Sequence, residues 1–249
     1  MNYDELARVI TKAGRILTEN GAEIWRVEDT MYRLAKAYGA TTVDSYATPT
    51  LLIISFTAEG RLTHNMKRVS SRSVDLSKMD AINSLSRQVC TQGMDVEKFD
   101  ALLDEIDQQN NGNFMLHSLG SAICCFGFAL FFGASLIEAL IAAVIGVIVK
   151  LIADTLSQYF PSDFFIHLIS AFTLTVLASI LTGFFGANRD IVAISSLMIL
   201  VPGLAITNAI RDSVGGDLLS GLSRATEALF IAVALAVGSA LAFLFMGAL

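Results

Sequence analysis

Residues 118–137 read SLGSAICCFGFALFFGASLI, a run of 20 residues without a charged side chain. A helix of about 20 mostly apolar residues is long enough to cross the hydrocarbon core of a bilayer. Three further uncharged runs follow along the chain, at Leu168–Asn188, Ile191–Ile210 and Ala228–Leu249. Each of the four runs therefore predicts a membrane-spanning helix.

A fifth apolar segment is harder to interpret. Ala139–Val149 is only 11 residues long, because Glu138 and Lys150 bound it. It crosses the membrane if both charges lie near an interface or face protein, and it is re-entrant otherwise. We expect it to span. The predicted membrane domain then covers residues 114–249, with spans at about 115–135, 136–153, 165–187, 191–210 and 226–247.

The N-terminal part of the chain has a different composition, with 29 of the 40 charged residues in positions 1–113. Apolar residues recur at helical spacing over 6–17 and 24–35, and residues 41–69 change to a strand-like pattern with a hairpin turn at 58–60. Two more helices are expected at about 76–91 and 95–108. The fold class predicted is thus a membrane protein. A small α/β (α+β) domain, residues 1–108, and a polar linker, 109–113, precede an α-helical bundle of about five transmembrane helices.

Basic residues fall mainly on one side of these five spans. If the N-terminal domain is cytoplasmic, the inner side holds its 13 basic residues together with Lys150, Arg211 and Arg224, and the outer side holds Arg189. This distribution agrees with the positive-inside rule. The N-terminus is charged and lacks the apolar core of a signal peptide. We therefore expect a cytoplasmic N-terminal domain and a C-terminus on the outside.

Several function classes are disfavoured. The N-terminal half is moderately acidic, whereas nucleic-acid binding requires clustered Lys and Arg. The three cysteines, Cys90, Cys124 and Cys125, form neither a disulfide framework nor a zinc motif. The sequence contains no GxSxG, HExxH, CxxC or phosphate-loop motif. We expect no enzyme activity, no catalytic residues, no metal, no cofactor and no nucleic-acid partner.

The most informative polar stretch is residues 201–228, VPGLAITNAIRDSVGGDLLSGLSRATEA. Pro202 interrupts an apolar run, so it breaks or kinks the helix there. Such a break is either a packing kink or a way to present backbone groups to a transported solute. The charges that follow lie close to the bilayer and should pair or face water.

Helical spacing groups these polar side chains into two faces, one before and one after Gly215-Gly216. The stretch is either a cytoplasmic loop with snorkelling side chains or, as we prefer, the polar lining of a solute pathway. Its candidate residues are Pro202, Gly203, Asn208, Arg211, Asp212, Asp217, Ser220, Arg224 and Glu227.

Four acidic or basic residues elsewhere are candidates for coupling or gating. Glu23, Arg26 and Glu28 lie in the segment GAEIWRVE, residues 21–28, where Glu23 and Arg26 can form a local ion pair. Such a pair contributes little stability, so we interpret the segment as a docking or gating element. Glu138, near the outer end of the second span, is the candidate for a proton- or substrate-coupling carboxylate. Gly120, Gly127, Gly183, Gly186 and Gly238 are expected to permit close helix packing.

Two stretches resemble the threonine/serine exporter (ThrE-type) family of bacterial membrane proteins. They are GAEIWRVE at residues 21–28 and the pattern PG-x4-NAIRD-x3-GD-x2-SG-x2-R-x2-EA from Pro202 to Ala228. The resemblance covers essentially the whole chain. It implies export of small polar metabolites across the bacterial inner membrane, with threonine and serine as the named substrates. Related two-component systems are associated with dicarboxylate (succinate) export.

The resemblance also implies partners. Longer members of the family carry about twice as many membrane helices, so this chain resembles the larger component of a split exporter. We expect the lipid bilayer, a small solute, a second small membrane subunit and/or a homo-oligomer as partners. Transport would be secondary, with proton coupling as one option.

Three functions remain open. An amino-acid zwitterion would need Arg211 or Arg224 for its carboxylate and Asp212 or Asp217 for its ammonium group. A dicarboxylate would need only the arginines. The third reading is a membrane-anchored regulatory or scaffold protein.

Overall fold

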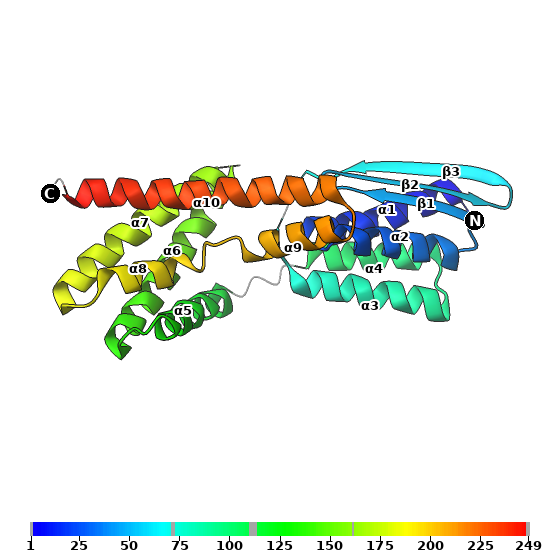
Figure 1. Ribbon diagram of the computed structural model, residues 1–249. Helices are drawn as coiled ribbons and strands as arrows, with labels where there is room; N and C mark the ends of the chain where they lie inside the picture. The colour runs from blue at the N-terminus through cyan, green and yellow to red at the C-terminus, as the bar shows by residue number, and fades with distance from the viewer. Residues whose placement is uncertain (1, 71–72, 110–113, 161, 248–249) are drawn as a thin grey trace. The chain divides into compact units, whose positions relative to one another are not determined.

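The computed structural model describes residues 2–70, 73–109, 114–160 and 162–247 (Figure 1). Most of the expected linker, residues 110–113, lies outside the described residues, as do residues 248 and 249. The chain divides into two compact units. Unit 1 comprises Met1–Asn110 and Leu204–Ala225, and unit 2 comprises Asn111–Gly203 and Thr226–Leu249.

Unit 1 contains the elements expected for the N-terminal part of the chain. They are α1 (Tyr3–Glu19), α2 (Ile24–Ala37), β1 (Thr42–Ala47), β2 (Leu51–Ala58), β3 (Arg61–Arg68), α3 (Leu76–Gln92) and α4 (Val96–Gln108). The side chains of Asn2 and Asp75 cap the first turns of α1 and α3, as short polar residues do at helix N-termini. The four predicted helices and the hairpin at 58–60 are confirmed.

The three strands form one antiparallel sheet in the order β1-β2-β3. Alternate residues of β2 are buried, from Leu52 to Ala58, because successive side chains of a strand point to opposite faces. The hairpin between β2 and β3 turns at Glu59 and Gly60, which have φ values of 49° and 75°. An antiparallel sheet beside separate helices is an α+β arrangement.

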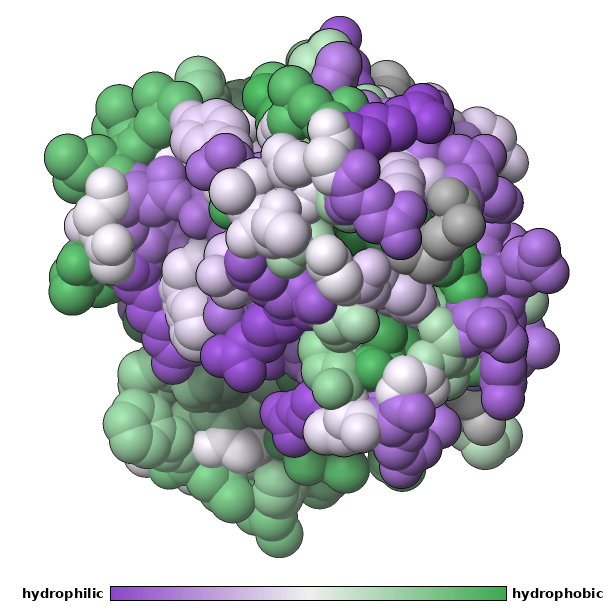
Figure 2. Space-filling model, turned by 90° about the vertical axis from the view of Figure 1, so that its right-hand side faces the viewer, coloured by the Kyte–Doolittle hydropathy of each residue, from purple (hydrophilic) through white to green (hydrophobic). Residues whose placement is uncertain are grey.

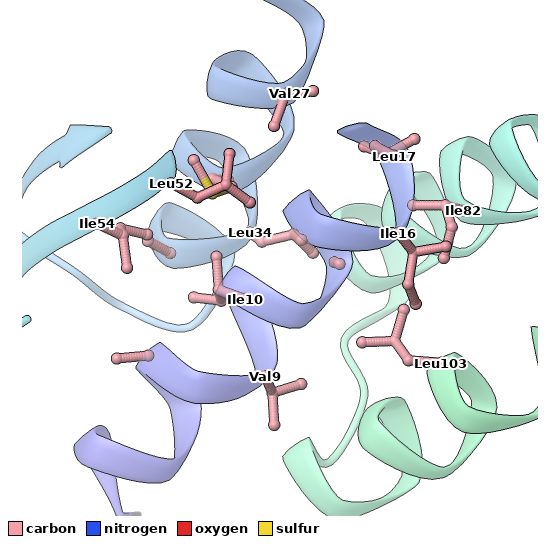
Figure 3. Packing of buried hydrophobic residues seen from close by; sticks show 14 of the residues in the cluster. Val9, Ile10, Ile16, Leu17, Val27, Leu34, Leu52, Ile54, Ile82 and Leu103 are labelled. Carbon is pink, nitrogen blue, oxygen red and sulfur yellow. The ribbon is translucent and has the colours of Figure 1, made fainter. Parts of the chain in front are cut away.

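Helix α1 lies at the centre of unit 1, between the sheet and the pair α3–α4 (Figure 3). Ile10 points towards Leu34 and the sheet, whereas Ile16 points towards Ile82 and Leu103. All of these side chains are at most 1% exposed. A helix that is apolar on most of its circumference is buried in this way. Hydrophilic side chains cover much of the surface of unit 1 that Figure 2 shows.

Unit 2 packs α5 (Phe114–Phe131), α6 (Leu136–Tyr159), α7 (Asp163–Phe185) and α8 (Arg189–Leu197) with the later part of α10 (Leu218–Gly247). Its buried core is rich in alanine, including Ala142, Ala171 and Ala178. Small residues let helix backbones approach closely. A Cβ on Gly146 would lie 2.5 Å from Cys125 Sγ, and a Cβ on Gly238 would lie 2.3 Å from Leu168 O.

The expectation of close packing therefore holds for Gly238 but not for the other glycines named from the sequence. A Cβ on Gly120, Gly127, Gly183 or Gly186 would meet nothing within 4 Å in the described structure. Gly186 instead ends α7 with a left-handed backbone, φ 63°, for which glycine carries no steric penalty.

Four helices of the described structure are long and apolar enough to cross a membrane: α5, α6, α7 and α10. The uncertain second segment is among them, because α6 runs for 24 residues and Lys150 pairs with Asp154 at 2.6 Å.

The expected continuous span at 191–210 is not formed and requires correction. The structure has α8, of 9 residues, then Met198–Pro202 without a helix, then α9 (Gly203–Val214), of 12 residues. Pro202 supplies the reason for the break, since proline has no N–H and clashes with the preceding turn. The predicted break at Pro202 is confirmed, and neither short helix reaches the length of a span.

Candidate functional site

The polar stretch after Pro202 folds into a helical hairpin of unit 1, formed by α9 and the first residues of α10. Gly216, with φ 96°, lies in the turn between them. Gly221 brings the helices close, because a Cβ there would be 2.8 Å from Ala209 O. Asp217 precedes α10, accepts a hydrogen bond from Ser220 Oγ at 3.3 Å, and donates its N–H to Asp212 O at 2.8 Å.

This hairpin binds the loop between α1 and α2 and the first residue of α2, Ile24, largely through backbone atoms of those residues. Asn208 Nδ2 donates to Gly21 O at 3.0 Å, and Arg224 Nη2 donates to Ala22 O at 2.7 Å. In return, Ile24 N–H donates to Asp212 Oδ1 at 3.2 Å. The loop thus finds hydrogen-bond partners for backbone groups that would otherwise be left unsatisfied when buried.

Two ion pairs accompany these backbone contacts. Arg224 Nε lies 3.1 Å from Asp212 Oδ2, and the two side chains are 11% and 0% exposed. Arg211 Nη1 pairs with Glu23 Oε1, and Glu23 Oε2 lies 3.2 Å from Arg26 Nη1. The expected pairing of Arg224 with an acidic neighbour and the local Glu23–Arg26 pair are confirmed, whereas Arg211 pairs with Glu23 of the distant loop.

Asp212 also completes the N-terminus of α2. The residue before this helix, Glu23, makes no side-chain capping bond, and the first turn of α2 contains no acidic residue. The Asp212 carboxylate supplies both an acceptor and a negative charge there, although it is 188 residues away in the chain. Negative charge is favourable at this end of the helix dipole.

Burial raises the pKa of Asp212, and Arg224 and the Ile24 N–H lower it to a smaller extent. Burial disfavours the charged form of a carboxyl group, whereas a cation or a hydrogen-bond donor favours it. Each charge of the Asp212–Arg224 pair is therefore stable in its buried position only because the other compensates it.

A pocket of about 340 Å³ opens beside this cluster, within unit 1. Its lining includes three carboxylates, those of Glu28, Asp212 and Asp217, and it is completed by Trp25, Ser45, Tyr46, Gly215 and Gly216. Glu28 Oε1 accepts the Ala47 N–H at 2.8 Å. Burial raises the pKa of Glu28, the Ala47 N–H lowers it, and the negative charge of Asp217 adds to the rise. Carboxylates and aromatic rings together suit a cationic group.

The structure does not bring all candidate residues to this pocket. Pro202 lies in the break before α9 and Gly203 is the first residue of that helix; both belong to unit 2. Glu227 lies on α10, two residues after the end of unit 1, and is half-buried. Glu138 forms a capping box with Ser135 at the start of α6, and its Oε1 accepts the Asn188 N–H at 2.7 Å.

Sequence reasoning did not single out the aromatic residues Trp25 and Tyr46. Their exposed fractions are 53% and 46%, which is high for large side chains of a folded domain. Trp25 lies inside the segment 21–28 that was singled out, so its presence there was an available signal. Tyr46 reaches the pocket through the packing of β1 against α2, where Ser45 and Ala47 donate to Glu28, and the sequence pattern does not specify this packing.

Comparison with known proteins connects this architecture to transport. The model of the family described as "Putative threonine/serine exporter" matches residues 8–246. The chain belongs to the threonine/serine exporter family. The resemblance expected from the two motifs is thereby confirmed, and the four apolar helices fit a membrane protein of an exporter family.

Three relatives of this exporter-family chain show how its length compares. It is 23% identical over 230 residues to the "Probable threonine/serine exporter" of Mycobacterium tuberculosis, covering 91% of this chain and 44% of that protein. It is 20% identical to the "Probable succinate transporter subunit YjjP" of Klebsiella aerogenes and of Escherichia coli, covering 97% of this chain and 94% and 95% of those proteins. The chain thus spans less than half of the mycobacterial relative. No solved structure matches it.

Proposed function

We propose that this chain is a membrane component of an exporter of small polar solutes, with serine or threonine as the transported class. The observation that carries the proposal is the acidic pocket beside the α9–α10 hairpin, in a chain that belongs to an exporter family. The pocket would receive the solute on the cytoplasmic side, before it passes along the membrane helices.

The chemistry of the pocket favours an amino acid over a dicarboxylate. Glu28, Asp212 and Asp217 offer negative charge to an ammonium group, and the pocket lining contains no Lys or Arg among the described residues. The nearby arginines already have partners, Glu23 for Arg211 and Asp212 for Arg224. A dicarboxylate would be repelled here unless these ion pairs first opened. An amino acid carries one carboxylate, so it needs only one of the two arginines, and its ammonium group is attracted by the acidic lining.

The topology we propose places unit 1 in the cytoplasm and the C-terminus outside. Helix α10 has 30 residues and begins within unit 1, so at 1.5 Å per residue it extends about 45 Å, more than a hydrocarbon core of about 30 Å. Termini on opposite sides require an odd number of crossings. With α5, α6, α7 and α10 as four, the fifth is α8 together with the non-helical residues Met198–Pro202, which belong to unit 2.

Thiol labelling tests this topology. In a cysteine-free background, Ala187→Cys lies in the loop between α7 and α8 and is expected to react with an impermeant maleimide added to intact cells. Phe160→Cys, between α6 and α7, is expected to react only after the membrane is permeabilised. The reverse pattern would show that the orientation is wrong.

A second subunit is part of the proposal. The two succinate transporter subunits align with this chain over nearly their full length. Their description as subunits supports a partner for this chain too. These relatives also keep succinate as the alternative substrate. The remaining alternative, a regulatory scaffold, predicts no flux in any combination of subunits.

The decisive experiment is reconstitution of the full chain in proteoliposomes, with and without a co-encoded small membrane protein. Flux of labelled serine, threonine and succinate would be compared for the wild type and Asp217→Asn. Asparagine removes the charge but keeps a side-chain oxygen that can accept the hydrogen bond from Ser220 Oγ. Loss of a hydrogen bond to a charged group is worth about 1.5–3 kcal/mol, which predicts a roughly 10- to 100-fold loss of serine or threonine transport at low concentration.

Asp80→Asn is the matched control, because Asp80 is an exposed carboxylate outside the pocket lining. It should transport as the wild type does. If Asp217→Asn transports serine and threonine normally at equal protein levels, the ammonium site is wrong. If only succinate is transported, the dicarboxylate alternative is correct.

A further inference from the structure

A second pocket of unit 1, of about 390 Å³, lies between α2 and α3 and has the opposite charge to the acidic pocket. We call it the arginine groove. Arg26, Arg33 and Arg87 line it, and Asp29 is the one carboxylate in its lining. The remaining lining residues are Trp25, Thr30, Asn83, Ser86, Cys90 and Thr91. Its volume is within the range of small-molecule sites.

The helices explain why these side chains meet. On α2, Arg26, Asp29 and Arg33 are three and four residues apart, so they share one face of the helix. On α3, Asn83, Arg87 and Cys90 follow the same spacing. The packing of α2 against α3 brings the two polar faces together along the groove.

The positive charge of the groove is only partly neutralised. Asp29 pairs with Arg33 at 2.8 Å, and Arg26 shares Glu23 with Arg211. Within the described residues Arg87 has no ion-pair partner. Burial raises the pKa of the Cys90 thiol, so this group adds no negative charge at neutral pH. Three guanidinium groups against one carboxylate leave a net charge of +2 in the lining of a chain whose net charge is −6.

We propose that the arginine groove is a binding site for a small dianion that carries carboxylate or phosphate groups. Guanidinium groups bind both oxyanions through paired N–H donors. The amide of Asn83 adds a neutral hydrogen-bonding group to the same lining. The site is separate from the acidic pocket and does not depend on the function proposed for that pocket.

The groove is connected to the α9–α10 hairpin through one side chain. Arg26 Nη1 lies 3.2 Å from Glu23 Oε2, and the other carboxylate oxygen of Glu23 binds Arg211 of α9. Glu23 is 7% exposed. An anion held by Arg26 would compete with Glu23 for the same guanidinium group, and so would change the charge balance around Arg211. Binding of an anion in the groove therefore alters the ion pair between Glu23 and Arg211 of the hairpin.

The chain carries its own reporter for this site, because Trp25 is its one tryptophan and lines the groove. Succinate and inorganic phosphate would be titrated separately into the full-length protein in detergent, at constant ionic strength, while Trp25 emission is recorded. We expect a saturable change with at least one of them, and the tighter of the two identifies the class of anion. Chloride at the same ionic strength should give no saturable change.

Arg87→Ala is expected to weaken the apparent Kd about tenfold or more, from the loss of a charge-assisted hydrogen bond. Arg61→Ala removes an exposed arginine outside the groove and should leave the Kd unchanged. Trp25 also lines the acidic pocket, so its emission could report on either site. If the anion binds in the arginine groove, Asp217→Asn, which alters only the acidic pocket, should retain the response to the anion. No saturable response to either anion, or equal affinities for the wild type and Arg87→Ala, would overturn the proposal.

Discussion

The buried pair of Asp212 and Arg224 gives the sharpest test of how unit 1 is held together. Arg224→Met keeps much of the aliphatic side chain but removes the Nε contact to Asp212 and the Nη2 donor to Ala22 O. Breaking a buried ion pair by removing one partner costs about 3–5 kcal/mol, because the other charge is left uncompensated. We expect the free energy of unfolding of unit 1 to fall by that amount at neutral pH.

The loss should depend on pH with a defined sign. Burial already raises the pKa of Asp212 in the folded protein, and removal of Arg224 raises it further. A carboxyl group with a raised folded pKa contributes stability below its unfolded value of 3.8, and this contribution is lost as the pH rises through the folded pKa. Arg224→Met should therefore be destabilised more at about pH 8 than at about pH 5.

The assay follows the emission of Trp25 during unfolding of the full-length protein in detergent, since this residue adjoins the Ile24 N–H that binds Asp212. Asp212→Asn combined with Arg224→Met removes both charges and keeps an acceptor for Ile24, so we expect it to recover part of the loss. A destabilisation below about 1 kcal/mol, or equal losses at the two pH values, would refute the reasoning. Strictly additive losses in the double variant would refute it as well.

Three further predictions concern other contacts. Asp100 pairs with Arg8 and Lys12, each at 2.6 Å. Burial alone would raise the pKa of Asp100, but the hydrogen bonds from these two cations outweigh burial and lower the pKa. Asp100→Asn should therefore cost about 1–2 kcal/mol at neutral pH, and in a denaturation series this cost should disappear as the pH falls below 3.8 and through the lowered pKa. Gly221→Ala should lower the melting temperature, with a cost of about 1–3 kcal/mol for overpacking against Ala209 O, whereas Gly203→Ala, whose Cβ meets nothing within 4 Å, should not. Glu138→Ala should lower the melting temperature slightly, because it removes one half of the capping box at the start of α6. Proton-dependent flux unchanged in Glu138→Gln would exclude a coupling role for this carboxylate.

Local structure was largely predictable from the sequence. The apolar period of α1 and α2 and the turn at Glu59-Gly60 both depend on neighbours within a few residues. The expected span at 191–210 failed for a related reason. Its apolar composition satisfied the length rule, but Pro202 and the polar face of α9 divide it into two helices.

The contacts of the candidate site were less predictable. The polar residues after Pro202 and the segment 21–28 were both identified from the sequence, but as separate features. Asn208 and Arg224 bind backbone carbonyl groups of Gly21 and Ala22, and every residue offers such a group. No pattern of side chains could therefore reveal that the two segments meet.

The sequence by itself determined that this is a membrane protein with a charged N-terminal domain, because long uncharged runs and helical or strand-like periods follow from local composition. It also determined the family, through two motifs that the family comparison confirmed. Only the tertiary structure decided that Asp212 caps α2, that Arg211 pairs with Glu23, and that Trp25 lies between an acidic pocket and the arginine groove. These contacts join residues up to about 200 positions apart, and such pairings depend on how helices pack rather than on the order of residues along any one of them.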